Sequence, residues 1–485
     1  MTPNLTRRSF IATTALTAAS LGLPRSAWAA THKPLLLTAT SRPLDIDGRA
    51  ATVWGLINAQ GGSGLTLDPG QRFRVDLTNA LDVDTIIHWH GQIPPNAQDG
   101  VPDIPLPMLK PGETREFDFE PMPGTYWMHS HVPVQEMELL AAPLIVRSAA
   151  DLTADRQEVV LFLHDFSFRP AAEVLAEITG GDGSMAGMDM GAATPAPDAT
   201  TGMDMAGKGM SGMAMDLNDF NFDAYLANDR TLNDPEVVTV ENGGRVRLRV
   251  INAAAATVFW IDTGSVEGRL VAVDGHEVQP LPGRRFGLAM GQRLDIELDL
   301  PNGEGAFPVL ALREGAVERT GIILATAGAT IEKLAGTGET MAAAFDTDLS
   351  QEAALRAMSP LSDRPADTAA MLMLGGSMQP YLWTINGQSW GNHTPITAKS
   401  GQRVELTFHN MSMMAHPMHL HGHMFQVVAL NGKRFAGAMR DTVQVPPMAM
   451  VTVAVDAGEA ARWMLHCHHM PHLSTGMMTE FAVSA

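Results

Sequence analysis

The sequence contains little cysteine, little tyrosine and few basic residues. It has one Cys and three Tyr in 485 residues, and 33 Lys and Arg against 53 Asp and Glu, which gives a formal net charge of -20. A single cysteine cannot form a disulfide within the chain, so Cys467 is either a buried structural thiol or a functional thiolate. No basic patch stands out. Because nucleic-acid binding draws its affinity from clustered Lys and Arg, we expect no nucleic-acid partner.

The apolar run near the N-terminus is too short for a membrane anchor. It covers residues 11–23, whereas a membrane-spanning helix needs roughly 20 residues. It follows the pair Arg7-Arg8 and precedes a small-residue site that ends at Ala29 and Ala30. This order is typical of a twin-arginine export signal. We therefore expect residues 1–30 to be a signal peptide cleaved near Ala29/Ala30, a mature protein in the periplasm, and no membrane span.

Glycine and proline are abundant, and short segments of alternating apolar residues recur along the chain. There are 45 Gly and 31 Pro. Alternation with a period of two is the pattern of strands that have one face on a core. The length exceeds one ordinary domain and suggests about three. These features predict an all-β protein.

Three segments repeat one pattern. They are GQRFRVDLTN at 70–79, GGRVRLRVIN at 243–252 and GQRVELTFHN at 401–410. Each has Gly-x-Arg, then alternating apolar residues and a final Asn. A repeat of this kind indicates three copies of one β domain.

The repeat sets the expected domain layout. We place the three domains at 31–150, 151–330 and 365–485, with a linker at 331–364 between the second and the third. A segment of Met, Gly, Asp, Ala and Pro at about 181–216 is inserted in the second domain. It has too few branched or aromatic residues to build a core, so we expect it to be disordered or mobile.

Four His-x-His pairs occur, two in the first domain and two in the third. They are 88/90, 129/131, 419/421 and 466/468. On a strand, the two histidines of a pair lie on one face about 6.6 Å apart, which suits bridging two metal ions better than chelating one. The second domain has Ile261-Asp262 at the matching place. We therefore expect eight imidazoles to hold three copper ions between the first and third domains.

Cys467 projects from the opposite face of its strand to His466 and His468. A cysteine thiolate with two imidazoles and a weak methionine is the ligand set of a blue-copper electron-transfer site. The candidate partners are His416, His472 and, ten residues after the cysteine, Met477. The other seven histidines lie outside this pattern and are assigned no metal role.

The motifs HWHG, HSH, HPMHLHG and HCHHMPHLSTGM resemble the four copper signatures of the multicopper oxidases, and the resemblance spans the whole mature chain. It implies three cupredoxin-like Greek-key β-sandwich domains and four copper ions per chain. By position, the implied ligands are His416, Cys467, His472 and Met477 for type 1 copper; His88 and His419 for type 2 copper; His90, His129 and His468 for one type 3 copper; and His131, His421 and His466 for the other.

The family reaction takes electrons one at a time from a reducing substrate at type 1 copper and reduces dioxygen to two waters at the cluster. Cys467 is thus the implied point of electron uptake. Asp99 matches the family's carboxylate beside the cluster and is our candidate proton relay. It could equally be the first residue of an Asp-Gly turn. Many bacterial relatives have Glu directly after the last type 1 histidine; here Leu473 stands there, so that part of the proton path is missing or supplied from elsewhere.

The signal peptide and the methionine-rich insert resemble those of bacterial copper-resistance oxidases, which oxidise cuprous ion. Thioethers are soft ligands that favour Cu(I). The candidate Cu(I) ligands are Met413, Met414, Met188, Met190, Met203 and Met205. Ser412 stands where an acidic Cu(I) ligand would sit, and the insert precedes the second repeat, whereas in the best-known periplasmic cuprous oxidases it belongs to the third domain. The insert could also be a plain surface tether.

Two other functions remain open. A general phenol-oxidising laccase would take electrons from small phenolic reductants at an exposed edge of His472. A non-catalytic periplasmic copper-binding protein would hold Cu(I) on the methionine segment and use the domains as a scaffold, although the complete ligand set favours an oxidase. Dioxygen is the second substrate of either oxidase, and we expect a monomer.

Overall fold

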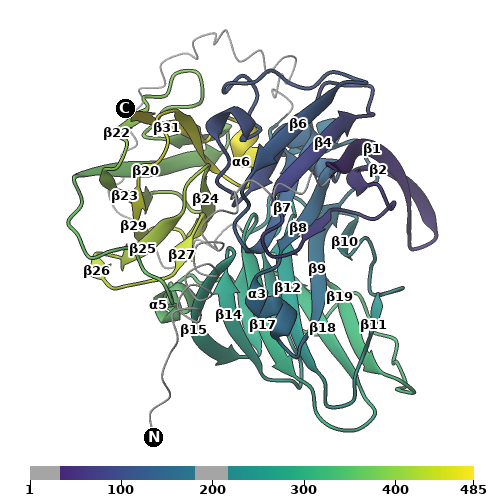
Figure 1. The fold of residues 1–485 in the computed structure, drawn as a ribbon. Helices are drawn as coiled ribbons and strands as arrows, with labels where there is room; N and C mark the ends of the chain where they lie inside the picture. The colour runs from purple at the N-terminus through teal and green to yellow at the C-terminus, as the bar shows by residue number, and fades with distance from the viewer. Residues whose placement is uncertain (1–32, 181–216) are drawn as a thin grey trace, which may run out of the picture. The chain divides into compact units, whose positions relative to one another are not determined.

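A computed structural model describes residues 33–180 and 217–485. The predicted signal peptide and the methionine-rich insert lie outside the described residues. Strands are the main regular structure of the described residues, and they form six sheets (Figure 1). The prediction of an all-β chain is confirmed. Within the described ranges, no helix is long and apolar enough to cross a membrane.

The first sandwich is built from two four-stranded sheets. One has the order β2 (Arg49–Asn58), β1 (Leu35–Ile46), β4 (Phe73–Asn79) and β6 (Thr114–Phe119). The other has the order β3 (Leu65–Leu67), β8 (Ala141–Val146), β7 (Gly124–Ser130) and β5 (Ile87–His90).

The second sandwich has a six-stranded and a five-stranded sheet. The first of these has the order β10 (Ala224–Ala227), β9 (Gln157–Phe166), β12 (Arg245–Asn252), β17 (Arg293–Asp299), β14 (Gly268–Val273) and β15 (His276–Gly283). The second has the order β11 (Val237–Val240), β19 (Arg319–Thr326), β18 (Ala306–Arg313), β13 (Phe259–Asp262) and β16 (Arg285–Leu288).

The third sandwich has a seven-stranded and a five-stranded sheet. The larger has the order β21 (Tyr381–Ile385), β20 (Thr368–Met378), β23 (Arg403–Asn410), β29 (Met450–Asp456), β25 (Phe425–Leu430) and β26 (Lys433–Arg434), with β27 (Met439–Arg440) also paired to β25. The smaller has the order β22 (Ile396–Lys399), β31 (Met478–Ser484), β30 (Arg462–Cys467), β24 (His416–Leu420) and β28 (Thr442–Val445).

The helices in the described ranges are all short. They are the 3-10 helix η1 (Asn96–Gln98), α2 (Pro133–Met137), α3 (Ala149–Thr153), α4 (Ala171–Ile178), α5 (Ser350–Ala354) and α6 (Met470–Ser474). Ser148 caps the N-terminus of α3. Its hydroxyl oxygen accepts the Asp151 backbone N–H, and the Asp151 carboxylate accepts the Ser148 backbone N–H.

The three predicted repeats form the equivalent strands β4, β12 and β23, and the final Asn of each has the same role. Asn79, Asn252 and Asn410 are fully buried. Each carboxamide oxygen accepts the backbone N–H two residues on, and each amide donates to a backbone carbonyl of a later loop or strand. A side chain that carries both donors and an acceptor can satisfy a buried turn in this way. The repeated Asn therefore fixes how the chain leaves each strand.

The strands that carry the His-x-His pairs lie next to each other within their sheets. In the first sandwich His88 on β5 is opposite His129 on β7, and in the third His419 on β24 is opposite His466 on β30. The second histidine of three pairs, His131, His421 and His468, comes just after the strand ends. The pairs therefore meet at the ends of four strands, where two sandwiches can approach each other.

Candidate metal centre

Cys467 and two histidines come together inside the third sandwich. The Cys467 Sγ lies 3.7 Å from His416 Nδ1 and 3.5 Å from His472 Nδ1, and the two Nδ1 atoms are 3.1 Å apart. Met477 is buried in the same apolar core cluster as Cys467, and its backbone carbonyl accepts the Cys467 N–H at 3.0 Å. The structure thus brings together all four residues predicted to bind type 1 copper.

The side chains around this group leave one nitrogen of His416 available. Its Nε2 lies 2.8 Å from the Ser412 hydroxyl, whose single proton can be given to Asn410 Oδ1 or the Met414 carbonyl. The hydroxyl oxygen then accepts from Nε2–H, so Nδ1 keeps its lone pair. Ser412 is therefore a positioning residue for His416.

The eight remaining histidines form one buried cluster across two sandwiches. His88 Nε2 lies 3.4 Å from His419 Nε2, and the His90 and His419 rings stack at 3.8 Å. The nitrogen atoms of His131, His421 and His466 all lie within 4.8 Å of one another. The rings of His90, His129 and His468 lie 4.9 to 5.5 Å apart, pair by pair. These groups match the ligand sets that the sequence resemblance implies.

Hydrogen bonds to backbone carbonyls fix the tautomers of several cluster histidines. The Nδ1 atoms of His88, His129, His419 and His466 each lie 2.8 to 3.0 Å from a carbonyl oxygen. A carbonyl can only accept, so each Nδ1 carries the proton and each Nε2 presents a lone pair. His90 is reversed: its Nε2 lies 3.2 Å from Asp441 Oδ1, which leaves Nδ1 facing the cluster.

Asp99 lies beside the cluster and is buried. Its Oδ2 lies 2.8 Å from His421 Nδ1, and its backbone carbonyl accepts from His88 Nδ1. It is also a turn residue, because it ends η1 and precedes Gly100, whose φ is +87°. A Cβ at Gly100 would meet the Ile87 carbonyl oxygen at 1.9 Å, so only glycine fits there. The turn holds the carboxylate against the two histidines, so Asp99 is a turn residue that also lies beside the cluster.

The second sandwich supplies no histidine to the cluster, but it supplies a buried cation. Arg293 Nη1 donates to Asp441 Oδ1 at 2.7 Å, and Arg293 Nε donates to the Thr125 carbonyl of the first sandwich. Burial alone would raise the pKa of Asp441, yet the Arg293 guanidinium holds that pKa well below its usual range. Arg293 therefore keeps Asp441 ionised beside His90 and ties the three sandwiches together at the cluster.

Replacing Arg293 should lower stability strongly. In Arg293→Met, Asp441 and Asp274 lose the buried cation between them, and uncompensated buried charge typically costs about 3–5 kcal/mol. Urea unfolding of the purified protein measures the loss. The matched control is Arg285→Met, whose ion pair with Asp262 lies at the surface and whose loss should cost less than about 1 kcal/mol. Equal losses for the two variants would contradict this account.

A carboxyl group that the sequence did not point to lies on the far side of the cluster. Glu136, in α2, has its Oε2 2.7 Å from His129 Nδ1 and its Oε1 3.9 Å from His468 Nδ1. Burial raises the pKa of Glu136 well above its usual range. Leu473 instead packs in an apolar cluster with Met464 and Met470. The acidic group on this side is thus supplied by the first sandwich and not by position 473.

His472 is more enclosed than the sequence suggested. Its side chain is fully buried, so the expected exposed edge is wrong. The His469 ring stacks on it at 3.9 Å and Trp383 packs on it at 4.2 Å. Asp219 Oδ2 lies 3.8 Å from His472 Nε2 and also bonds to the Tyr381 hydroxyl. The sequence signal for Asp219 is weak, since it is one of several acidic residues at the end of the insert.

The described residues on either side of the insert lie against the third sandwich. Ile178, at the end of α4, packs on the core cluster that contains Cys467, and Asp219 contacts His472. Of the two predicted substrate ligands near His416, Met413 is half-buried and Met414 is part of the core. Met413 is therefore the one accessible to an incoming ion. The four candidates Met188, Met190, Met203 and Met205 lie outside the described residues.

The donor set fits copper. Burial lowers the pKa of His416 to about 3, so its imidazole is neutral, the form that binds metal. Burial also raises the pKa of the Cys467 thiol, so only a bound cation would make it a thiolate. His131 Nε2 and His468 Nε2 are buried without a hydrogen-bond partner in the described ranges. Neutral imidazoles, one sulfur and unsatisfied nitrogens are what copper sites need.

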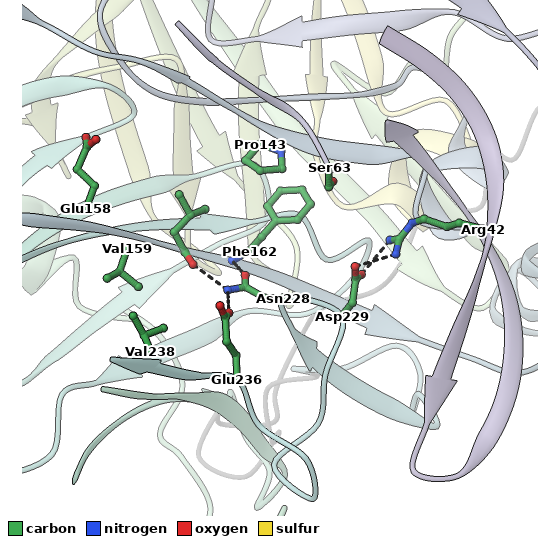
Figure 2. Close-up of a pocket in the computed structure, with 11 residues that line it drawn as sticks. Arg42, Ser63, Pro143, Glu158, Val159, Phe162, Asn228, Asp229, Glu236 and Val238 are labelled. Carbon is green, nitrogen blue, oxygen red and sulfur yellow. Dashed lines mark hydrogen bonds and ion pairs between the residues drawn. The ribbon is translucent and has the colours of Figure 1, made fainter. Parts of the chain in front are cut away.

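A separate cavity of about 330 Å³ lies between the first and second sandwiches (Figure 2). Arg42 forms a bidentate ion pair with Asp229 at one end, and Asn228, next to Asp229, donates to Glu236. None of the predicted copper ligands lines it. Its charged groups are already paired, so the candidate site remains the histidine cluster and the Cys467 group.

Comparison with known proteins agrees with this geometry. Family models described as multicopper oxidase match residues 38–151, 158–329 and 363–485. Multicopper oxidase MmcO of Mycobacterium tuberculosis is 30% identical over 469 residues, which cover 93% of this chain and 87% of that protein. Copper resistance protein A of Escherichia coli is 24% identical over a match that covers 85% of this chain and 86% of that protein.

A solved laccase structure from Botrytis aclada has the same fold, with a TM-score of 0.71 at 21% identity over 92% of this chain and 87% of that one. The three sandwiches are thus cupredoxin-like, as predicted. Three matching family models and a relative at 30% identity cover nearly all of the described residues. The chain therefore belongs to the multicopper oxidase family.

Proposed function

We propose that this multicopper oxidase is a cuprous oxidase that serves copper tolerance. Membership of the family makes it an oxidoreductase that uses copper, dioxygen and a reducing substrate. The observation that carries the narrower proposal is the position of Asp219, whose carboxylate is buried 3.8 Å from the Nε2 of His472. A carboxylate at the electron-accepting edge attracts a cation, and the insert that ends just before it is rich in soft thioethers.

The proposed ligands follow the groups that the structure brings together. Four copper ions would be held by His416, Cys467, His472 and Met477 (type 1); His88 and His419 (type 2); His90, His129 and His468 (type 3); and His131, His421 and His466 (type 3). When bound, copper supplies one-electron acceptance from the substrate and four-electron reduction of dioxygen to water.

The chain itself provides the path between the two sites. Cys467 is bonded through one peptide unit to His466 and through another to His468, and both of these histidines belong to the cluster. The His466 Nδ1 also donates to the Cys467 carbonyl at 3.0 Å. Electrons leaving the Cys467 sulfur thus have a covalent route of one residue to the cluster, with no solvent gap to cross.

Asp99 is our proposed proton relay. Reduction of dioxygen to water consumes protons, and a buried cluster needs a group that delivers them. The Asp99 carboxylate is in hydrogen-bond range of His421 Nδ1, and its second oxygen has no hydrogen-bond partner in the described ranges. A carboxylate with a spare oxygen can hold a proton beside the cluster and release it there.

The phenol-oxidising laccase is the second candidate, because solved laccases share the fold. Its substrate would have to deliver electrons to His472. That ring is enclosed by His469, Trp383 and the Asp219–Tyr381 pair. A small cation beside Asp219 meets less steric resistance than a phenol does, which favours Cu(I).

The remaining proposals concern location and organisation. We propose export to the periplasm, on the strength of Arg7-Arg8 and the small-residue site near Ala29/Ala30. We keep the domains at 31–150, 151–330 and 365–485, and we propose that the enzyme is monomeric.

Three measurements on the purified protein test the proposal. An oxidase should be intensely blue, contain about four coppers per chain and take up oxygen when Cu(I) is added. A copper-binding protein without catalysis would take up no oxygen. Parallel kinetics with Cu(I) and a phenol, before and after excess copper is added, decide between the two oxidases, since a cuprous oxidase should turn over Cu(I) faster.

Deleting residues 185–215 should slow Cu(I) oxidation more than phenol oxidation. The deletion removes eight methionines but leaves Asp219 and the type 1 ligands intact. Steady-state rates with the two substrates measure the effect, and we expect about a tenfold larger loss with Cu(I), which corresponds to roughly 1.4 kcal/mol. Equal losses, or none, would reduce the insert to a tether.

A further inference from the structure

The outer face of the larger sheet in the third sandwich carries methionines around one histidine. Met373 on β20 is opposite His409 on β23, and His409 is opposite Met450 on β29. Directly opposed residues on neighbouring strands project from the same face, with Cβ atoms about 5 Å apart. The three side chains therefore form one row across three adjacent strands, which Figure 1 shows side by side.

Three further methionines lie next to this row along the chain. Met371 precedes Met373 by two residues on β20, and a spacing of two returns a side chain to the same face of a strand. Met411 directly follows β23, and Met448 lies in the turn before β29 with a φ of +60°. Pairing continues past the strand ends, since the Asn410 N–H donates to the Ala449 carbonyl. We name these six residues the methionine face: Met371, Met373, His409, Met411, Met448 and Met450.

Packing does not account for these residues. The alternate positions Leu372, Phe408 and Val451 are buried in the core, whereas Met371 is 57% exposed. Met411 and Met448 are 52% and 50% exposed. An outward position on a sheet that faces solvent is ordinarily polar. In the parts of the chain that the structure describes, the His409 imidazole makes no hydrogen bond or ion pair.

We propose that the methionine face binds a cuprous ion through Met373, His409 and Met450, with the other three methionines as further thioether donors. Thioether and imidazole are ligands that suit Cu(I). No carboxylate belongs to the six, so hard divalent cations are not favoured. The row brings two thioethers and one imidazole together without any movement of the backbone.

The chain connects this face directly to the type 1 site. Met411 is followed by Ser412, whose hydroxyl bonds to His416 Nε2. A cuprous ion on the face is therefore held at the end of β23, the strand that leads into the type 1 ligands. The methionine face would be the place where a cuprous oxidase collects its substrate, which deepens the proposed function. The binding site rests on that function only for the source of the ion.

The test is a titration of the full-length, copper-loaded enzyme with Ag(I), which has the softness of Cu(I) but is not oxidised by the enzyme. The triple variant Met373→Leu/His409→Gln/Met450→Leu should lose one equivalent of tightly bound Ag(I), or bind it at least tenfold more weakly. In wild type the ε-methyl NMR signals of Met373 and Met450 should shift with the first equivalents. The matched control is Met341→Leu/Met358→Leu, two exposed methionines outside the face, which should change neither readout.

Unchanged Ag(I) stoichiometry and affinity in the triple variant would overturn the proposal. The single variant His409→Gln keeps all the methionines, so it tests the proposal even if the triple variant does not fold. It too should weaken Ag(I) binding about tenfold. Phenol oxidation should be the same in every variant. One further outcome is that wild-type enzyme oxidises Cu(I) no faster than phenol while the triple variant still loses its Ag(I) equivalent. In that case the cuprous oxidase proposal fails and the binding site stands.

Discussion

Cys467→Ser should abolish the blue colour and the oxidase activity while leaving the fold largely intact. Cys467 supplies the only thiol in the chain, and a serine hydroxyl neither ionises readily nor offers a soft donor. The substituted atom is similar in size, and the side chain lies in a closed core. An unsatisfied hydroxyl there should cost about 1–3 kcal/mol of stability. Visible absorption, copper content and oxygen uptake measure the outcome.

The control for this variant is Ser130→Ala. Ser130 occupies the place in the first sandwich that Cys467 occupies in the third, between two cluster histidines of a paired strand. Its hydroxyl donates to Gln135, so the substitution also removes a buried side-chain contact. It should remain blue. Full oxidase activity in Cys467→Ser, or loss of the blue colour in both variants, would contradict the assignment of electron uptake to Cys467.

Asp99→Asn should slow dioxygen reduction by about a hundredfold, the lower end of the usual contribution of general acid–base catalysis. Asparagine keeps the shape of the residue and also favours turns, but it cannot carry a proton to the cluster. Electron uptake at the type 1 site should be unchanged. Stopped-flow measurements separate the two steps, with anaerobic bleaching of the blue colour reporting uptake and its return on mixing with oxygen reporting reduction of dioxygen.

Asp103→Asn is the matched control for Asp99→Asn. Asp103 lies in the same loop with a φ of +58°, is exposed and contacts none of the cluster histidines in the described structure. The control should reoxidise at the wild-type rate. Because Asn supports a turn as well as Asp does, wild-type reoxidation in Asp99→Asn would mean that Asp99 is only a turn residue. Slower anaerobic bleaching would instead mean that the substitution disturbs the type 1 site.

The copper ligands could be predicted because their signals are local. A pair such as His88 and His90 specifies its own geometry through the two-residue period of a strand. The repeated Asn showed where each pair should fall, since Asn79 and Asn410 each precede a His-x-His motif by nine residues. Such patterns require no knowledge of which sheets meet.

The supporting residues could not be predicted, because each acts across a long stretch of chain. Arg293 meets Asp441 at a separation of 148 residues. Asp99, which meets His421 at a separation of 322, was expected beside the cluster only because of the resemblance to the family. An isolated Arg or Asp has no periodic pattern that marks its partner. Glu136 likewise looks like any helical glutamate until the first sandwich packs against His468.

The expectation that His472 is exposed failed for the same reason. Its ligand role follows from its spacing to Cys467, but its exposure depends on Trp383 and Asp219, which come from other parts of the chain. The methionine face is a similar case. Met373, His409 and Met450 are scattered in sequence, and only the register of three strands aligns them.

The sequence by itself determined that this is an all-β multicopper oxidase with a cysteine between two cluster histidines, because strand alternation and ligand spacing are encoded over a few residues. Only the tertiary structure decided what surrounds those ligands. It placed Asp219 beside His472, Glu136 beside His129 and Arg293 in an ion pair with Asp441. The physical reason is that burial and charge pairing depend on which surfaces of the sandwiches come into contact.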